Sequence, residues 1–318
     1  MRAGIVGVGK LGGAVAQAFA LDGTWDELVL CDAAPDLAWA QAEDLRHGFA
    51  RDPGVEVFAG ELADLAGSDV VVLAAGQGRK PGMTRLDLLH ANAGLVADVS
   101  QSIARAARNA TLLVLTNPVD VMTTVAWSAT GRPRDRILGS GTLVDSVRLR
   151  TALAELKGVP VAEVDATVLG EHGDRAVPIF SRARVHGRPL DLTPEERDGL
   201  LQEVRGIAAR IIDVKGGTAF GPAGCTATLA RAVVAPTASV LPASVVLEGE
   251  YGLRDVAVGV PAVVGQGGVI KVEEWPLRSE EQAALQEAGR DLAGFVEDAA
   301  VVLGLAVRHT TLDRLTSA

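Results

Sequence analysis

The sequence predicts an α/β protein in which a doubly wound parallel sheet is followed by a domain of mixed α+β structure. In the first half of the chain, short apolar runs alternate with helical stretches, a pattern typical of a parallel sheet covered by helices. Later in the chain, longer apolar runs punctuated by glycine and proline favour antiparallel strands. We therefore expect residues 1–140 and 141–318 to form two domains, with a cleft between them.

Each expected element follows from the spacing of its apolar residues. In the first half we expect strands at 3–7, 27–31, 69–74, 111–115 and 136–138. The helices expected between these strands include 13–21 and 87–107. In the second half we expect strands at 166–169, 239–247 and 256–264, and helices at 143–156, 194–214, 220–234 and 279–305.

Composition excludes several classes of function. The chain has 318 residues, a net charge of −10 and no cluster of Lys and Arg, so it lacks the basic face that nucleic-acid binding requires. Its longest uncharged run, 232–247, is too short to span a membrane and contains Pro236 and Pro242. Cys31 and Cys225 have no metal-ligand spacing and are expected to be reduced, buried thiols. A cytoplasmic location is expected, with no metal, nucleic-acid or membrane partner.

A glycine-rich turn follows the first expected strand. Residues 7–12 read Gly-Val-Gly-Lys-Leu-Gly, with the spacing that gives a tight turn, close approach of a pyrophosphate and close helix packing in a Rossmann domain. Asp32 ends the second strand twenty residues after Gly12, where a carboxylate can bind ribose hydroxyls and repel a 2′-phosphate. The sequence therefore predicts NAD rather than NADP, the alternative being a structural turn with an incidental surface aspartate.

Four further segments carry polar residues at the ends of expected strands or on a helix. They are a loop with two arginines at 76–87, Thr-Asn-Pro-Val-Asp at 116–120, Val-Asp-Ser-Val-Arg at 144–148 and Gly-Glu-His-Gly-Asp at 170–174. Together with the glycine-rich turn, and in this order, they resemble the lactate/malate dehydrogenase family. The resemblance extends over nearly the whole chain. It implies a dehydrogenase of 2-hydroxy acids whose first domain binds NAD and whose second is catalytic, assembled as a homodimer or homotetramer.

The resemblance also implies roles for individual residues. His172 is the acid/base, Asp145 its orienting carboxylate, Arg148 the clamp for the substrate carboxylate, Arg85 a second cation brought by the loop, and Asn117 a neighbour of both nicotinamide and substrate. Thr218 is a further substrate contact. The implied cofactor contacts are Gly7, Gly9, Lys10, Leu11, Gly12, Asp32, Ala75, Gly76, Asn92, Thr116 and Asn117.

Reaction chemistry supports these roles independently. Transfer of hydride to a ketone builds negative charge on the carbonyl oxygen, so a donor that titrates near neutrality must deliver a proton, which favours His172. A buried Asp145 would fix the histidine tautomer and stabilise the imidazolium. The planar guanidinium of Arg148 can hold a carboxylate through two parallel bonds. Arg85 would polarise the carbonyl when the loop closes and water is expelled.

The substrate depends on what faces its third carbon. Arg79 stands where lactate enzymes of the family usually have Gln and malate enzymes Arg, and a second carboxylate in a closed cavity needs such a cation. Met83 and Pro222 are also malate-like, whereas 170–173 and Thr218 are closer to lactate enzymes. Malate and oxaloacetate are thus the predicted pair, with lactate or another 2-hydroxy acid as the alternative. A non-catalytic NAD-binding sensor is a further alternative. Such a protein would not need the reaction residues, yet all of them are present in this sequence.

Overall fold

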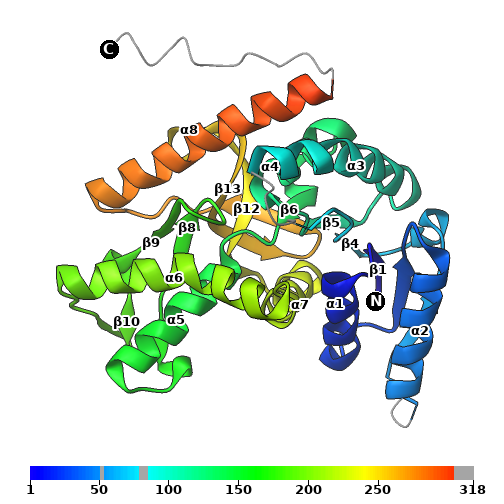
Figure 1. The fold of residues 1–318 in the computed structure, drawn as a ribbon, viewed down its shortest axis with the longest axis horizontal. Coiled ribbons are helices and arrows are strands. Elements are labelled where there is room, and N and C mark those ends of the chain that lie inside the picture. Colours follow the sequence, from blue (N-terminus) through cyan, green and yellow to red (C-terminus); the bar gives the residue numbers. More distant parts are fainter. Residues whose placement is uncertain (51–53, 79–84, 304–318) are drawn as a thin grey trace.

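The computed structural model describes residues 1–50, 54–78 and 85–303, which form an α/β fold around one continuous sheet (Figure 1). Across this sheet of eleven strands the order is β3-β2-β1-β4-β5-β6-β12-β13-β8-β9, and β14 pairs with β13. The order reverses between β1 and β4, where a crevice forms at the carboxyl ends of parallel strands. The doubly wound parallel sheet followed by mixed α+β structure confirms the predicted fold class.

The first six strands pair in parallel. Val70–Leu73 and Thr111–Val114 are buried at every position, because helices cover both faces of a parallel sheet and leave no polar side. The strands are β1 (Arg2–Val6), β2 (Glu27–Cys31), β3 (Glu56–Ala59), β4 (Val70–Leu73), β5 (Thr111–Val114) and β6 (Ile137–Gly139).

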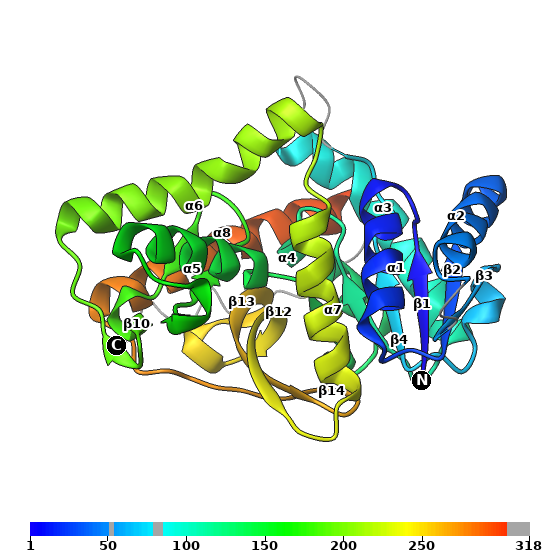
Figure 2. The same cartoon turned by 90° about the horizontal axis from the view of Figure 1, so that it is seen from below.

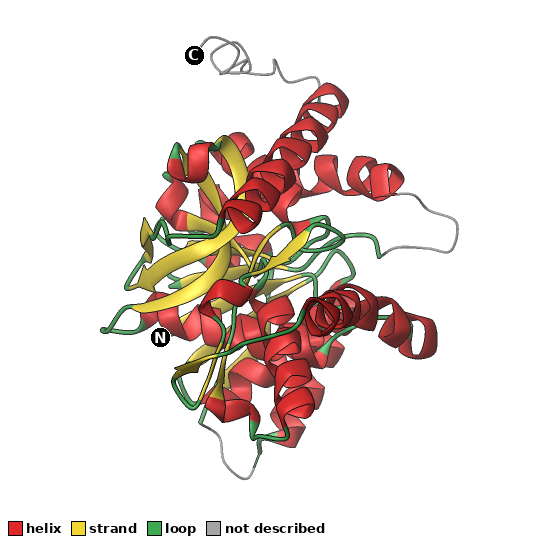
Figure 3. Cartoon of the chain, turned by 90° about the vertical axis from the view of Figure 1, so that its left-hand side faces the viewer, coloured by secondary structure: helices red, strands yellow, loops and turns green. Residues whose placement is uncertain are grey.

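Four helices accompany these strands, and Figure 3 distinguishes helices from strands by colour. They are α1 (Lys10–Asp22), α2 (Pro35–Gly48), α3 (Arg85–Ala106) and α4 (Val119–Thr130). The first helix begins at Lys10, three residues before the predicted start at 13, because the amide of Gly13 already donates to the carbonyl of Gly9 at 2.8 Å. The glycine-rich turn is therefore joined directly to a helix N-terminus, which favours an anion there.

The second half continues the sheet with antiparallel strands, as predicted. The strands of the main sheet here are β8 (Val168–Gly170), β9 (Ala176–Pro178), β12 (Ser239–Glu248), β13 (Arg254–Gly265) and β14 (Gly268–Val272). A small separate sheet contains β7 (Val164–Asp165), β10 (Arg184–Val185) and β11 (Arg188–Pro189). The helices are α5 (Leu143–Lys157), α6 (Pro194–Lys215), α7 (Phe220–Val234) and α8 (Ser279–Val302).

The hydrophobic core has two parts. The larger part follows the main sheet through both halves of the chain, and α7 packs against α1 so that the halves are in direct contact (Figure 2). The smaller part lies under α5 and α6 and includes Leu149, Leu153 and Leu200. Within the described ranges, no helix is long and apolar enough to cross a membrane.

The central strand β5 offers a direct test of this core. Leu113 has no exposed surface, whereas Leu21 on α1 is 68% exposed. Replacing Leu113 with Ala should reduce the free energy of unfolding by about 2–5 kcal/mol, because the lost methyl groups leave a cavity. The matched Leu21→Ala change should stay within about 0.5 kcal/mol. Denaturant titration of both variants measures the difference, and equal losses would contradict the described packing.

Candidate active site

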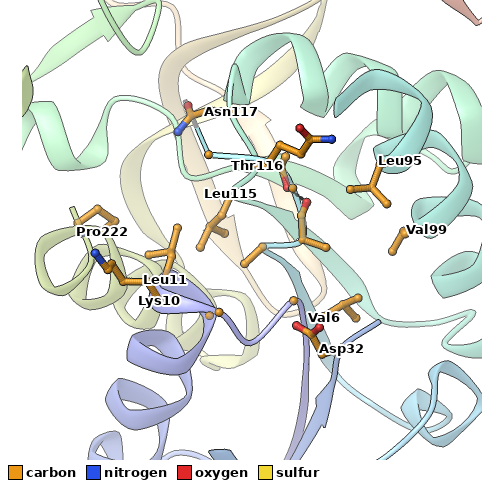
Figure 4. A pocket seen from close by; sticks show the side chains of 18 of the residues that line it. Val6, Lys10, Leu11, Asp32, Leu95, Val99, Leu115, Thr116, Asn117 and Pro222 are labelled. Atoms are coloured by element: carbon orange, nitrogen blue, oxygen red, sulfur yellow. Dashed lines mark hydrogen bonds between the residues drawn. The ribbon is translucent and has the colours of Figure 1, made fainter. Parts of the chain in front are cut away.

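A large cavity opens at the carboxyl ends of the parallel strands. Its volume is about 1650 Å³, and residues from both halves of the chain line it. In Figure 4 the cavity extends from Asp32, at the end of β2, towards Asn117, beyond the end of β5, with Lys10 and Leu11 along one side. Parallel strands present their ends together at this edge, so separate loops converge on one site.

The glycine-rich turn forms the floor of one end of this cavity. A side chain at Gly7, where φ is +88°, would place its Cβ 2.3 Å from the amide nitrogen of Ala75. A Cβ at Gly12 would lie 1.8 Å from the carbonyl oxygen of Gly7, so these two glycines allow turn, strand and helix to pack closely. By contrast, a Cβ at Gly9 would meet nothing within 4 Å. The turn therefore leaves open space above Gly9, at the positive end of α1, where a phosphate can approach.

Asp32 lies beside this turn. Its Oδ2 accepts from the amide of Val8 at 2.9 Å and its Oδ1 from the amide of Ala34 at 3.0 Å. A carboxylate retains further lone pairs, and Asp32 lines the cavity, so it can also accept from ribose hydroxyls. Leu95 and Val99 of α3 provide an apolar wall suited to a base (Figure 4). The turn, the carboxylate and the wall fit a nicotinamide adenine dinucleotide.

The opposite wall comes from the segment between α6 and α7. Lys10 donates through Nζ to the carbonyl oxygens of Lys215 and Gly216, at 3.2 and 3.4 Å, where α6 ends. Thr218 and Pro222, both singled out in the sequence, line the cavity beyond these residues. The predicted cofactor and substrate segments therefore share one space.

The reaction end contains three ionisable side chains, of which Asp145 is buried and His172 and Arg148 are partly buried. Asp145 of α5 is 3% exposed and accepts through Oδ2 from Nδ1 of His172, at 2.6 Å. Its Oδ1 accepts from Nη1 of Arg148 at 2.8 Å, one helical turn along α5. His172 and Arg148 line the cavity, whereas Asp145 lies behind them. The carboxylate thus fixes the orientation of both side chains that line the cavity.

This grouping changes the titration of its members. Burial alone would raise the pKa of Asp145, but the charges and hydrogen bonds of His172 and Arg148 outweigh burial and lower it. Burial alone would lower the pKa of His172, but the charge of Asp145, its hydrogen bond and the charge of Asp120 outweigh burial and raise it. Arg148 opposes that rise. The site favours an ionised carboxylate beside a protonated imidazole.

Asn92 differs from the other predicted cofactor residues. Ala75, Gly76, Thr116 and Asn117 line the cavity, but Asn92 is fully buried and does not appear in its lining. Its Oδ1 accepts from the amide of Gln77 at 2.8 Å, and its Nδ2 donates to the carbonyl of Asn117 at 2.8 Å. Asn92 therefore connects two loops, at Gln77 and at Asn117, whose residues line the cavity. Sequence spacing alone cannot distinguish this supporting position from a direct contact.

Asp120 is a residue whose importance the sequence did not reveal. It ends the Thr-Asn-Pro-Val-Asp motif, is 2% exposed and accepts through Oδ2 from the amide of His172 at 2.8 Å. The contact joins residues 52 positions apart. The one feature of the sequence that could have pointed to Asp120 is its place in the motif at 116–120, which was already assigned to the active site.

The side chains of two predicted active-site arginines, Arg79 and Arg85, lie outside the described part of the structure. Arg79, like Met83, lies outside the described residues. Arg85 is the first residue of α3, and its side chain lies outside the described part of the structure.

A dinucleotide cavity lined at its reaction end by a histidine and an arginine, with a buried carboxylate bonded to both, defines the class of NAD-dependent oxidoreductases. Residues 1–139 match the lactate/malate dehydrogenase NAD binding domain, and residues 142–301 match the lactate/malate dehydrogenase alpha/beta C-terminal domain. The chain belongs to the lactate/malate dehydrogenase family, which confirms the resemblance found in the sequence.

Individual relatives include both named activities. A malate dehydrogenase of Halobacterium salinarum is 40% identical over 94% of this chain and 99% of its own length. An L-lactate dehydrogenase of Treponema denticola is 37% identical over 91% of this chain and 95% of its own. Among solved structures, malate dehydrogenase from Archaeoglobus fulgidus in complex with NADH has a TM-score of 0.86 and 37% identity, covering 94% of this chain and 100% of that one.

The open space above Gly9 leads to a test of cofactor binding. In Gly9→Ala, the new methyl group meets no protein atom but occupies the space that a pyrophosphate needs, so we expect NADH affinity to fall at least ~10-fold, about 1.4 kcal/mol. The melting temperature without ligand should change little. Gly48→Ala is the control, because a Cβ there also meets nothing and the residue lies outside the cavity. Fluorescence titration with NADH measures the effect, and unchanged affinity would contradict the assigned phosphate position.

Proposed function

We propose that the protein is a malate dehydrogenase that interconverts malate and oxaloacetate, with His172 as acid/base. The observation that carries this proposal is the hydrogen-bonded group of His172, Asp145 and Arg148 at one end of the dinucleotide cavity. NADH, when bound, supplies the hydride for reduction of the 2-oxo carbon. His172 donates its proton to the carbonyl oxygen, and in the reverse direction it accepts the hydroxyl proton.

The supporting residues orient this chemistry. Asp145 holds Nδ1 of His172, which leaves Nε2 to face the substrate and stabilises the imidazolium. Arg148 binds the substrate carboxylate, and Arg85 polarises the carbonyl from the loop side. Asn117 and Thr218 contact the substrate, and Asn117 also contacts the nicotinamide. The glycine-rich turn, Asp32 and the segments at 75–76 and 116–117 bind the dinucleotide.

Arg79 is the basis of the substrate proposal. Oxaloacetate carries a second carboxylate that pyruvate lacks, and an unpaired buried charge is costly. With Arg148 at the first carboxylate and Arg85 at the carbonyl, Arg79 supplies the third cation. Several relatives of this chain are named malate dehydrogenase, although others are named L-lactate dehydrogenase. L-lactate or another 2-hydroxy acid is therefore the second candidate.

The broader organisation is proposed on the same basis. We propose an NAD-binding domain over residues 1–140 and a catalytic domain over 141–318, supported by the two family matches, which meet near residue 140. Self-association as a homodimer or homotetramer is proposed from the family resemblance. A cytoplasmic location is proposed because Cys31 and Cys225 are free, buried thiols, and burial raises their pKa to about 12 and about 11.

The role of Asp145 is tested by pH dependence. Reduction needs the protonated form of His172. Because the pKa of His172 is raised, the rate should be sustained at pH values above the ordinary pKa of a histidine. The rate should then fall as the pH rises through the raised pKa. Asp145→Asn removes the charge, which should move the fall to lower pH and reduce kcat by roughly 100- to 10,000-fold. Oxaloacetate reduction followed across pH measures both effects. Asp198→Asn, on the exposed face of α6, is the control, and an unshifted profile in Asp145→Asn would overturn the assignment.

The role of Arg79 is tested by substrate choice. The wild-type protein should have a higher kcat/KM for oxaloacetate than for pyruvate, and Arg79→Gln should reduce that ratio on the order of 100-fold, because one carboxylate loses its cation. Arg105→Gln, at an exposed position of α3, should leave the ratio unchanged. A wild-type preference for pyruvate would overturn the substrate, whereas an unaltered ratio in Arg79→Gln would overturn only the role of Arg79.

A further inference from the structure

Asp120 is a buried carboxylate between three segments of the chain. It lies at the start of α4, and its Oδ2 accepts from the amide of His172 at 2.8 Å. Its Oδ1 accepts from Oγ of Ser244 at 2.5 Å, and Ser244 on β12 has no exposed surface. Both hydrogen bonds involve an ionisable acceptor shielded from water, where such bonds are strong.

Each of the three segments contributes to the active site or holds it in place. α4 follows Asn117 and Pro118, which line the cavity. His172 belongs to the loop after β8, outside α5, so Asp145 fixes its ring but not its peptide. Ser244 pairs with Gly139 of β6, at the seam where the parallel strands meet the antiparallel ones. Asp120 therefore connects the catalytic loop to both halves of the sheet.

The charged groups around His172 come from several elements. α5 contributes Asp145 and Arg148, whose effects on the pKa of His172 are opposite, and α4 contributes Asp120, whose charge raises it. The loop itself carries Glu171, Asp174 and Arg175, and Glu171 is buried and accepts from the amide of Arg175 at 3.3 Å. Asp120 is thus a second carboxylate, besides Asp145, that acts on the ring.

We propose that Asp120 is a positioning residue for the reaction, which fixes the peptide of His172 and supplies a second negative charge that favours the protonated ring. The proposal rests on the proposed function of His172 as acid/base. Asp120 is absent from the cavity lining and touches neither substrate nor cofactor space. Its loss should therefore affect kcat and its pH dependence, with KM values close to those of the wild type.

A purely structural role makes a different prediction. A carboxylate in the first turn of a helix also stabilises the positive helix end, and Asp120 occupies such a position in α4. If that were its whole role, replacement would lower the melting temperature without changing the titration of His172. The pH dependence of the ring therefore separates the two roles.

Asp120→Asn is the decisive variant, because the amide oxygen can still accept from the amide of His172 while the charge is lost. We expect kcat for oxaloacetate reduction to fall ~10-fold at about pH 8 and less than ~2-fold at about pH 6, with unchanged KM values. Proton NMR of the ligand-free protein should show that the His172 ring titrates at lower pH, with His172→Gln assigning the signal. Asp198→Asn serves as the surface control. An unaltered His172 titration and pH profile would overturn the proposal, whatever the change in melting temperature.

Two further variants test position apart from charge. Asp120→Glu retains the charge but displaces the carboxylate, and Ser244→Ala removes the bond that holds Asp120 in place. Both should lower kcat several-fold across the pH range, while the His172 ring titrates nearer the wild-type value. If Asp120→Asn does not fold, unchanged kcat in both of these variants would overturn the positioning role. If His172→Gln reduces oxaloacetate at the wild-type rate, the assignment of His172 as acid/base fails. The NMR titration of the wild-type and Asp120→Asn proteins would still report whether Asp120 affects the pKa of the His172 ring.

Discussion

The ionised carboxylate of Asp145 is the group on which the rest of the active site depends. It is 3% exposed, and a buried charge is tolerated only where partners compensate for lost hydration. The partners are the two side chains that face the cavity, His172 at 2.6 Å and Arg148 at 2.8 Å. Stabilising this one carboxylate therefore also fixes the proposed proton donor and the proposed substrate clamp. Despite burial, both partners lower the pKa of Asp145, and the contact with Asp145 raises the pKa of His172.

The fold supplies this carboxylate with its partners from different parts of the chain. Asp145 and Arg148 share α5, which begins shortly after β6, whereas His172 follows β8 on the far side of β12 and β13. The main sheet continues across the seam, and β8 pairs with β13 where Gly170 meets Gly259. A Cβ at Gly259 would lie 2.7 Å from the carbonyl oxygen of Gly170, so this approach requires glycine. Close packing there places the histidine loop against α5.

Sequence patterns predicted much of this arrangement, because they record local requirements. The glycine-rich turn, Asp32 and the apolar strands were identifiable from spacing, and the reaction residues were identifiable from motifs in a fixed order. Long-range contacts were not: nothing in the sequence pairs Asp120 with His172 or Ser244, and nothing distinguishes Asn92 as a brace between two loops. The strand β3 was also missed, since it begins at Glu56 and its apolar run of Val57, Phe58 and Ala59 is too short to give a pattern.

Arg148 links substrate binding to the protonation of His172. Its positive charge opposes the rise in the pKa of the ring, while the two carboxylates promote it. A substrate carboxylate bound to Arg148 would neutralise that positive charge. The negative charges of Asp145 and Asp120 would then raise the pKa of the His172 ring further. In the proposed reaction, the anionic substrate thus favours the protonated donor that its own reduction consumes. Until the anion arrives, the charges of Asp145 and Asp120 together oppose the effect of Arg148 on the pKa of the His172 ring.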